Sequence, residues 1–286
     1  MNKFALALLL TPASLTWAQF TLPSGPWLAL PNSVVISGEK IVDTDVSTPG
    51  NQTSYWNNNT DDGSTCRNVG CFVTNVGSPA NSPNWQGAAY LANNDGSAIS
   101  NISFQGTASA PNPTLLAEIA GWAPRNWIGW YDSSKSIASL TTSDFGVIFK
   151  GSNTVGDTVA FSPAGTFGFW LLPNYGDSSQ DGQSAGTVLA ALKSSGRFSE
   201  SSKSTGGGQQ QFAVFVENIG KVVPSQTSPF VALIGVEDTN LPGGDQDYND
   251  AIFKVTLVPE PGFYGALSLG LTGLVFAVRR RRASRS

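Results

Sequence analysis

The sequence contains no histidine. This absence excludes the Ser–His–Asp and Cys–His nucleophile systems, and it excludes zinc sites built on imidazole ligands. No other side chain normally titrates near neutral pH. An enzyme with this composition would have to rely on paired carboxylates, on a Ser–Lys pair or on tyrosine, so much hydrolase and metalloenzyme chemistry is excluded.

Cysteine is also scarce, with two residues in a chain of 286. Cys66 and Cys71 lie close together in the stretch CRNVGC. Zinc sites usually need four soft or imidazole ligands, so two cysteines alone make a poor metal site. In an oxidising compartment the pair predicts one local disulfide that closes a hairpin or loop, with two unpaired thiols as the alternative.

Charged residues make up only 13% of the chain, whereas turn-forming residues are frequent, with 31 glycines and 17 prolines. Short apolar or alternating runs rich in aromatic and β-branched residues recur between these turns, as in half-buried strands. The apolar content of 40% is enough for a sizeable core. The pattern predicts an all-β fold, with a single β-sandwich or jelly-roll-like domain over residues 19–258 and two smaller domains as the alternative.

Within this body, alternation predicts strands that include residues 71–77, 127–132 and 251–257. Residues 184–196 depart from the pattern, because their apolar side chains recur at helical spacing, and we expect a short helix there. The polar, low-complexity run 194–211 that follows predicts a mobile surface loop.

The N-terminus has the three parts of a secretory signal. Lys3 provides a positive charge, and residues 4–10 (FALALLL) form an apolar core. Residues 16–18 (TWA) then match the small-residue pattern of a cleavage site. We therefore expect residues 1–18 to form a cleavable signal helix. A buried N-terminal helix is the alternative.

The C-terminus has the features of a membrane-spanning tail. Residues 262–278 carry no charge and are followed at once by Arg279, Arg280, Arg281 and Arg282. Seventeen residues are close to the minimum for a helix that crosses a bilayer of about 30 Å. The arginines favour a cytoplasmic C-terminus. With an N-terminal export signal, this predicts a body outside the membrane and a tail anchored in it.

Pro259, Glu260 and Pro261 stand directly before the apolar span and the arginines. This order resembles the PEP-CTERM sorting tail of exported bacterial proteins, here over residues 259–286. The resemblance implies recognition and processing by an exosortase, a transpeptidase-like membrane enzyme. It also implies a bacterium with a Gram-negative-type envelope that makes exopolysaccharide, in which the protein is first tethered to the inner membrane and then reaches the cell surface or the exterior.

The body is more acidic than the whole chain, whose net charge is −4. Lys3 and the five arginines of the tail account for six of the 16 basic residues, and Glu260 for one of the 20 acidic ones. Residues 19–258 therefore keep ten basic and nineteen acidic residues, a net charge of −9. Such a surface repels nucleic acid and favours cations, so no nucleic-acid partner is expected.

The stretch EDTNLPGGDQDYND, residues 237–250, concentrates oxygen-bearing side chains between two predicted strands. Five carboxylates this close repel one another by about 1 kcal/mol per neighbouring pair even in water. Calcium prefers six to eight oxygen ligands and would offset this repulsion. The predicted metal ligands are Glu237, Asp238, Asp245, Asp247, Asn249 and Asp250.

This stretch is not an EF-hand, although Asp245, Asp247 and Asn249 match the first three ligand positions of that loop. Asp250 stands where the EF-hand needs glycine, and Thr256 stands where it needs a bidentate glutamate. The alternative is an acidic turn without metal, because Asp, Asn and Gly also build turns.

The same stretch carries a second resemblance. Glu237-Asp238, Gly243-Gly244 and residues 245–250 (DQDYND), placed before a final strand, are similar to the closing motif of an exported bacterial β-domain family of unassigned function. The resemblance implies a β-sandwich with calcium binding and no known activity.

Two other functions remain open from the sequence. The aromatic group Trp122, Trp127, Trp130 and Tyr131 could stack on sugars, as in a carbohydrate-binding module, although alternation places Trp127 and Tyr131 on one strand face and Trp130 on the other. A polysaccharide-active hydrolase would need two carboxylates in a cleft. Its scattered candidates are Glu118, Asp132, Glu217 and Glu237.

The sequence therefore predicts an exported, non-enzymatic protein of the envelope or extracellular matrix, stabilised by calcium. We expect it to be sorted by an exosortase-like system and to associate with exopolysaccharide.

Overall fold

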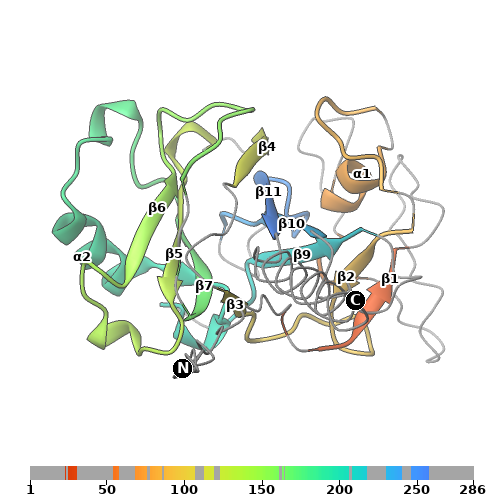
Figure 1. Cartoon of the computed structure of the whole chain (residues 1–286), viewed down its shortest axis with the longest axis horizontal. Helices are drawn as coiled ribbons and strands as arrows, with labels where there is room; N and C mark the ends of the chain where they lie inside the picture. The colour runs from red at the N-terminus through yellow and green to blue at the C-terminus, as the bar shows by residue number, and fades with distance from the viewer. Residues whose placement is uncertain are drawn as a thin grey trace, which may run out of the picture. The chain divides into compact units, whose positions relative to one another are not determined.

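Two antiparallel sheets account for most of the secondary structure in the computed structural model (Figure 1). The structure describes residues 23, 25–30, 54–57, 68–75, 78–85, 87–106, 113–118, 123–160, 163, 165–205, 208–217, 230–239 and 246–257. All of them belong to one compact unit, Phe20–Pro259. The fold of this part of the chain is all-β, as the sequence predicts.

The first sheet has six strands in the order β1-β2-β9-β10-β11-β4. Its strands are β1 (Trp27–Ala29), β2 (Ala89–Leu91), β4 (Thr114–Glu118), β9 (Phe212–Val216), β10 (Phe230–Val236) and β11 (Ala251–Leu257). Every pair of neighbours in it is antiparallel. In this order β10 and β11, the last two strands that the structure describes, are interior strands of the sheet.

The second sheet is built around β5 and β7, with the order β3-β7-β5-β6 and β8 paired to β7. Its strands are β3 (Phe104–Gly106), β5 (Trp127–Asp132), β6 (Phe145–Phe149), β7 (Gly165–Leu172) and β8 (Arg197–Phe198). The described residues also form four short 3-10 turns, η1 (Ala123–Arg125), η2 (Ile137–Ser139), η3 (Ser178–Gln180) and η4 (Ser201–Lys203).

One hydrophobic core joins the two sheets. Phe253 on β11 makes edge-to-face contacts with Phe149 on β6 and with Phe169 on β7, at centroid distances of 5.8 and 5.2 Å. The alternation of β11 explains this contact, since Ala251, Phe253 and Val255 all point into the shared core.

The outer face of each sheet is covered as well. Ile252, the neighbour of Phe253, packs into a second core with Phe72 and Val73 of helix α1 (Val69–Thr74). On the other sheet, Trp170 packs with Val188 and Leu192 of helix α2 (Ala185–Ser195). Each sheet is thus buried on both faces, and for this reason several strands read as continuous apolar runs.

Helix α1 corrects the strand predicted over residues 71–77. Asn68 caps its first turn by accepting a hydrogen bond from the Cys71 N–H at 3.0 Å. Asn75 then ends it in a left-handed conformation with φ 63°. The two asparagine caps stabilise a helix here, and their effect outweighs the strand propensity of CFVT.

Helix α2 confirms the helix predicted over residues 184–196. Ser184 is its N-cap and accepts from the Thr187 N–H at 3.2 Å. The prediction for the next segment is wrong, because part of 194–211 is built into the fold. Phe198 on β8 is buried against β7, and Gln210 is buried too.

Several predictions fall outside the described residues. They concern the signal helix of residues 1–18, Cys66, Asp245 and the whole tail of residues 259–286 with its proposed membrane helix. Within the part that the structure describes, none of the helices has the length and apolar character to cross a bilayer.

Candidate functional site

The pairing of β10 with β11 brings the two ends of the acidic stretch together. In this antiparallel pair, Gly235 lies opposite Ile252. The residues that follow β10, Glu237 and Asp238, therefore lie beside Asp250, which precedes β11. The backbone N–H of Asp238 donates to Asp250 Oδ2 at 2.6 Å and joins the two ends directly.

Three carboxylates meet at this point. One oxygen from each of Glu237, Asp238 and Asp250 lies within 4.8 Å of the other two. The exposed fractions of the three residues are 0%, 5% and 8%, so the group lies in the interior rather than on a solvated turn. Carboxylates are almost never buried in this way unless they are paired or coordinate a metal.

The hydrogen bonds made to these carboxylates favour their charged forms. The Thr239 N–H donates to Glu237 Oε1 at 3.1 Å, and the Thr239 hydroxyl donates to Asp238 Oδ1 at 3.1 Å. The amide of Asn126 donates to Asp238 Oδ2 at 2.6 Å. Donors aimed at a carboxylate stabilise its ionised state, so these hydrogen bonds partly offset the cost of burying the charges.

Ionised carboxylates at this spacing repel one another strongly. At 4.8 Å and an effective dielectric of about 20, each pair costs about 3.5 kcal/mol. Two events can relieve the repulsion: uptake of a proton by one carboxyl, or binding of a cation by all three. A hard divalent cation with oxygen ligands suits the donor set, which contains only carboxylate oxygens.

The remaining predicted ligands that the structure describes are buried in the same loop. Asp247 Oδ1 accepts a hydrogen bond from the Asn249 N–H at 3.0 Å, which forms an Asx-turn. Both residues are buried, and neither belongs to the group of three carboxylates. The predicted set therefore divides into a converging part and a part that shapes the turn, with Asp245 outside the described residues.

Close packing against β10 and α1 holds the loop in place. The Val69 N–H, at the start of α1, donates to the Asp247 carbonyl at 2.8 Å. A Cβ on Gly235 would lie 2.6 Å from the Tyr248 carbonyl oxygen and would collide with it. Glycine at position 235 thus lets the loop lie directly on the strand.

Gln246 and Tyr248 have left-handed backbone conformations, with φ 58° and 55°. This region is uncommon for residues other than glycine, and it is unusual for a bulky tyrosine. The buried Tyr248 hydroxyl donates to the Gln210 carbonyl at 2.5 Å, and its ring meets Tyr55 edge-on at 5.3 Å. Burial raises the pKa of Tyr248 well above its usual range, with smaller contributions from Tyr55 and Glu237.

Asn126 is a site residue that the sequence did not indicate. It lies between η1 and β5, is buried, and is 112 positions from its partner Asp238. Its Oδ1 also accepts from the Asn174 N–H at 3.0 Å, so it links the acidic group to the turn after β7. No local pattern marks a single asparagine for this role.

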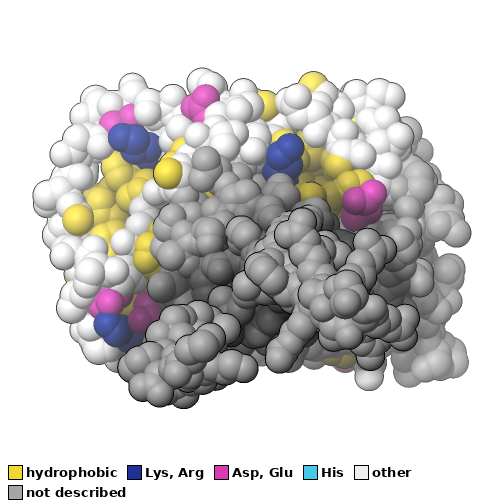
Figure 2. Space-filling model, in the orientation of Figure 1, with side chains coloured by type: hydrophobic (Ala, Val, Ile, Leu, Met, Phe, Trp, Pro, Cys, Tyr) yellow, Lys and Arg dark blue, Asp and Glu magenta, His cyan; other side chains and the backbone are white. Residues whose placement is uncertain are grey.

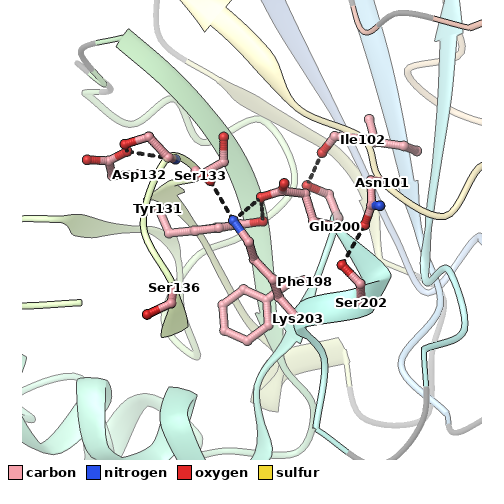
Figure 3. A network of polar contacts seen from close by, with 12 residues as sticks. Asn101, Ile102, Tyr131, Asp132, Ser133, Ser136, Phe198, Glu200, Ser202 and Lys203 are labelled. Atoms are coloured by element: carbon pink, nitrogen blue, oxygen red, sulfur yellow. Dashed lines mark hydrogen bonds and ion pairs between the residues drawn. The ribbon is translucent and has the colours of Figure 1, made fainter. Parts of the chain in front are cut away.

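A second polar cluster, centred on Lys203, ties β5 to the segment around η4 (Figure 3). In the figure the Lys203 ammonium lies between Ser133 and Glu200; it donates to the Ser133 carbonyl at 2.5 Å and to Glu200 Oε2 at 2.6 Å. Tyr131 donates to the same Glu200 oxygen at 2.6 Å. Burial, followed by the charge of Glu200, raises the pKa of Tyr131. Because these donors and acceptors pair with one another, the cluster stabilises the contact between β5 and the segment around η4.

The carboxylates named as candidates for a hydrolase lie apart. Asp132 accepts hydrogen bonds from Ser134 in a turn, Glu217 is exposed, and Glu237 belongs to the acidic group. Glu118, at the end of β4, has a raised pKa and a second carboxyl nearby. Burial and the nearby charge of Asp157 raise its pKa to about 7, whereas hydrogen bonds from Thr154 and Asn153 lower the pKa of Asp157.

The aromatic residues considered for sugar stacking lie mostly in the interior. Trp127 and Tyr131 share the outer core of the second sheet, on the strand face that alternation predicts. Trp130 packs from the other face against the core between the sheets. Buried rings cannot form an exposed stacking platform, so the hypothesis is wrong for Trp127 and Tyr131. Trp122 lies outside the described residues.

Charged side chains on the molecular surface contrast with the buried group. On the face in Figure 2, the Lys and Arg side chains of the described residues stand in separate places, interspersed with Asp and Glu. Exposed charges in such a mixture are screened by water and salt. At the acidic loop, by contrast, three charges of one sign lie buried together.

Residues 161–258 match the family described as Domain of unknown function (DUF4114). The matched part runs through β7, α2, β8, β9, β10 and β11, and it includes the whole acidic loop. The chain is thus similar to this family over its closing part. No curated protein and no solved structure matches the chain.

Proposed function

We propose that this protein is an exported, non-enzymatic protein of the bacterial envelope or extracellular matrix whose closing loop is stabilised by calcium. The observation that carries the calcium proposal is the buried group Glu237, Asp238 and Asp250, with oxygens within 4.8 Å of one another. These three residues would hold the ion, and other oxygens of the loop, from Asp245, Asp247 or Asn249, would complete the six to eight ligands that calcium takes.

The chemistry supplied by the ion would be structural. A divalent charge would offset the repulsion among the three carboxylates and fasten the end of β10 to the start of β11. Since these strands are interior members of their sheet, a fastened loop would stabilise the whole unit. We also propose that the two sheets form a β-sandwich of jelly-roll type, which the core shared by Phe149, Phe169 and Phe253 supports.

Thermal unfolding of the full chain in detergent solution tests the metal proposal. We expect the midpoint to rise when millimolar calcium replaces chelator, because binding to the native state alone stabilises it by about 2.7 kcal/mol at 100 times the dissociation constant. Magnesium should raise the midpoint less, since it demands octahedral geometry and gives up its waters reluctantly. An unchanged midpoint in millimolar calcium would refute the proposal.

Export and sorting rest on the two ends of the sequence. The signal features of residues 1–18 and the order of Pro259-Glu260-Pro261, apolar span and arginines support processing by an exosortase-like enzyme. In such a host we propose association with exopolysaccharide outside the inner membrane. Intact-mass analysis of the mature protein tests this: both ends should be missing. A mature product that keeps residues 1–18 and 262–286 would contradict it.

A polysaccharide-active hydrolase is the alternative function, and one observation favours it. Glu118, with its pKa raised to about 7, lies near Asp157, whose pKa is lowered. Two carboxyl groups with pKa values driven apart are typical of an acid and its partner in glycoside hydrolysis. Activity on polysaccharide that disappears in both Glu118→Gln and Asp157→Asn, with folding retained, would replace the non-enzymatic proposal.

A further inference from the structure

A cavity of about 230 Å³ lies beside the acidic loop, and two left-handed residues of that loop, Gln246 and Tyr248, line it. Uncommon backbone conformations persist where the surroundings enforce them, and they cluster at ligand sites. The volume is below the range of about 300–1,000 Å³ that is usual for drug-sized ligands. The space therefore suits one small ring rather than an extended chain.

Three polar side chains that line the cavity, those of Tyr248, Ser201 and Gln210, have their hydrogens engaged and can only accept hydrogen bonds. The Tyr248 hydroxyl uses its hydrogen on the Gln210 carbonyl, and the Ser201 hydroxyl uses its own on the Ser100 carbonyl. Both amide hydrogens of Gln210 are used as well, on the Ile99 and Ser199 carbonyls at 2.8 Å. A ligand that contacts these groups must supply the donors, as hydroxyl groups do.

The rest of the lining selects against charge. None of the lining residues that the structure describes is charged, so neither an anion nor an ammonium group would find an opposite charge among them. Gln209 and Gln246 stand at accessible positions of the lining and offer amide groups that can donate or accept. The half-buried Tyr55 adds aromatic surface for the apolar face of a ring.

We propose that this cavity binds a single neutral sugar residue through its hydroxyl groups. The inference deepens the proposed association with exopolysaccharide and rests on it, because it names where one unit of such a polymer would be held. It does not depend on the ion, because none of the three carboxylates that would hold the ion is among the described lining residues.

Ligand-observed saturation-transfer NMR on the full chain tests the proposal, with glucose, galactose, mannose and N-acetylglucosamine as neutral probes and glucuronate and glucosamine as charged ones. We expect at least one neutral sugar to give signal and the charged ones to give less. The absence of signal from every neutral sugar, or equal signal from the charged ones, would overturn the proposal.

Gly208→Phe provides the blocking variant. A Cβ at this lining position would meet the Ser201 carbonyl oxygen at 3.6 Å, an ordinary contact, so the larger side chain can fill the cavity without a backbone clash. Gly182→Phe is the matched control, because a Cβ there meets nothing within 4 Å and the position does not line the cavity. Sugar signal should be lost in the first variant and kept in the second. Signal that survives Gly208→Phe refutes the assignment.

Gln209→Ala gives an independent readout if Gly208→Phe lowers the yield of folded protein. The loss of one hydrogen bond should weaken binding about two- to tenfold, and unchanged affinity would count against the proposal. Each titration is run in calcium and in chelator alongside thermal unfolding. Sugar binding without a calcium shift sinks the metal proposal alone, and a calcium shift without sugar binding sinks this inference alone.

Discussion

Replacing Glu237 with glutamine should make the protein more stable when calcium is removed. Glu237 is fully buried, and its carboxylate forms two of the three repulsive pairs in the acidic group. Glutamine has nearly the same shape and no charge. Its new N–H groups would face the carboxylates of Asp238 and Asp250, which can accept them.

The magnitude follows from the geometry. At 4.8 Å and an effective dielectric of about 20, the two pairs lost amount to about 7 kcal/mol of gross repulsion. The wild-type protein need not pay the full repulsion, because protonating a carboxyl with an ordinary pKa of about 4.3 at pH ~7 costs only about 4 kcal/mol. Imperfect pairing of the buried amide costs about 1–3 kcal/mol. A net gain of about 1–3 kcal/mol remains, or about 2–10 °C in the unfolding midpoint for a unit of this size.

The assay is thermal unfolding of the full chain in chelator and in calcium. In chelator, Glu237→Gln should melt at a higher temperature than the wild type. When calcium replaces chelator, the midpoint of Glu237→Gln should rise less than that of the wild type, because one ligand is lost. Glu217→Gln is the matched control, since it makes the same chemical change at an exposed position. It should follow the wild type in both conditions. If Glu237→Gln melts below the wild type in chelator, the three carboxylates do not repel one another and the reasoning is refuted.

Three further predictions concern other parts of the unit. Glu118, whose pKa is raised from 4.5 to about 7 chiefly by burial, contributes stability below its ordinary pKa that is lost as the pH rises through about 7. In chemical denaturation, the wild-type free energy of unfolding should therefore fall by on the order of 1–2 kcal/mol between about pH 5 and pH 8, after allowance for solvent screening. Glu118→Gln should reduce this dependence on pH. An equal dependence in both proteins would contradict the raised pKa of Glu118. In Gly235→Ala the new Cβ would lie 2.6 Å from the Tyr248 carbonyl oxygen. This variant should lower the free energy of unfolding by about 2 kcal/mol or more and should reduce the rise in midpoint that calcium causes. An unchanged free energy of unfolding would show that the loop can move away from β10. Tyr131→Phe removes the 2.6 Å hydrogen bond to Glu200 and should cost about 1.5–3 kcal/mol in urea denaturation without changing the calcium shift; a changed shift would mean that the Lys203 cluster is coupled to the acidic loop.

The sequence was most informative where local pattern and burial agree. The alternation of 251–257 predicted a strand, and Ala251, Phe253 and Val255 on one of its faces are part of the core. The helix over 184–196 was also predictable, because Ser184 and apolar spacing act within one or two turns. The strand expected at 71–77 failed because two asparagine caps outweighed its propensity.

The polar run of residues 194–211 was misread for a related reason. Its composition is that of a surface loop, yet Phe198 pairs with β7 and fills the outer core, while Gln210 is buried with its amide hydrogens bonded to backbone carbonyls. Composition reports the average polarity of a segment. It does not report whether distant backbone groups are placed to satisfy the polar side chains.

By itself, the sequence determined the all-β class, the exclusion of histidine chemistry, and the concentration of carboxylates between the last two strands. These follow from residue types and from periodicities of a few residues, which act locally. Only the tertiary structure decided that Glu237, Asp238 and Asp250 converge while Asp247 and Asn249 shape the turn, and that Asn126 joins them from 112 positions away. Convergence depends on strand pairing and on packing between sheets, because side chains far apart in the chain can meet only after the backbone has closed the distance.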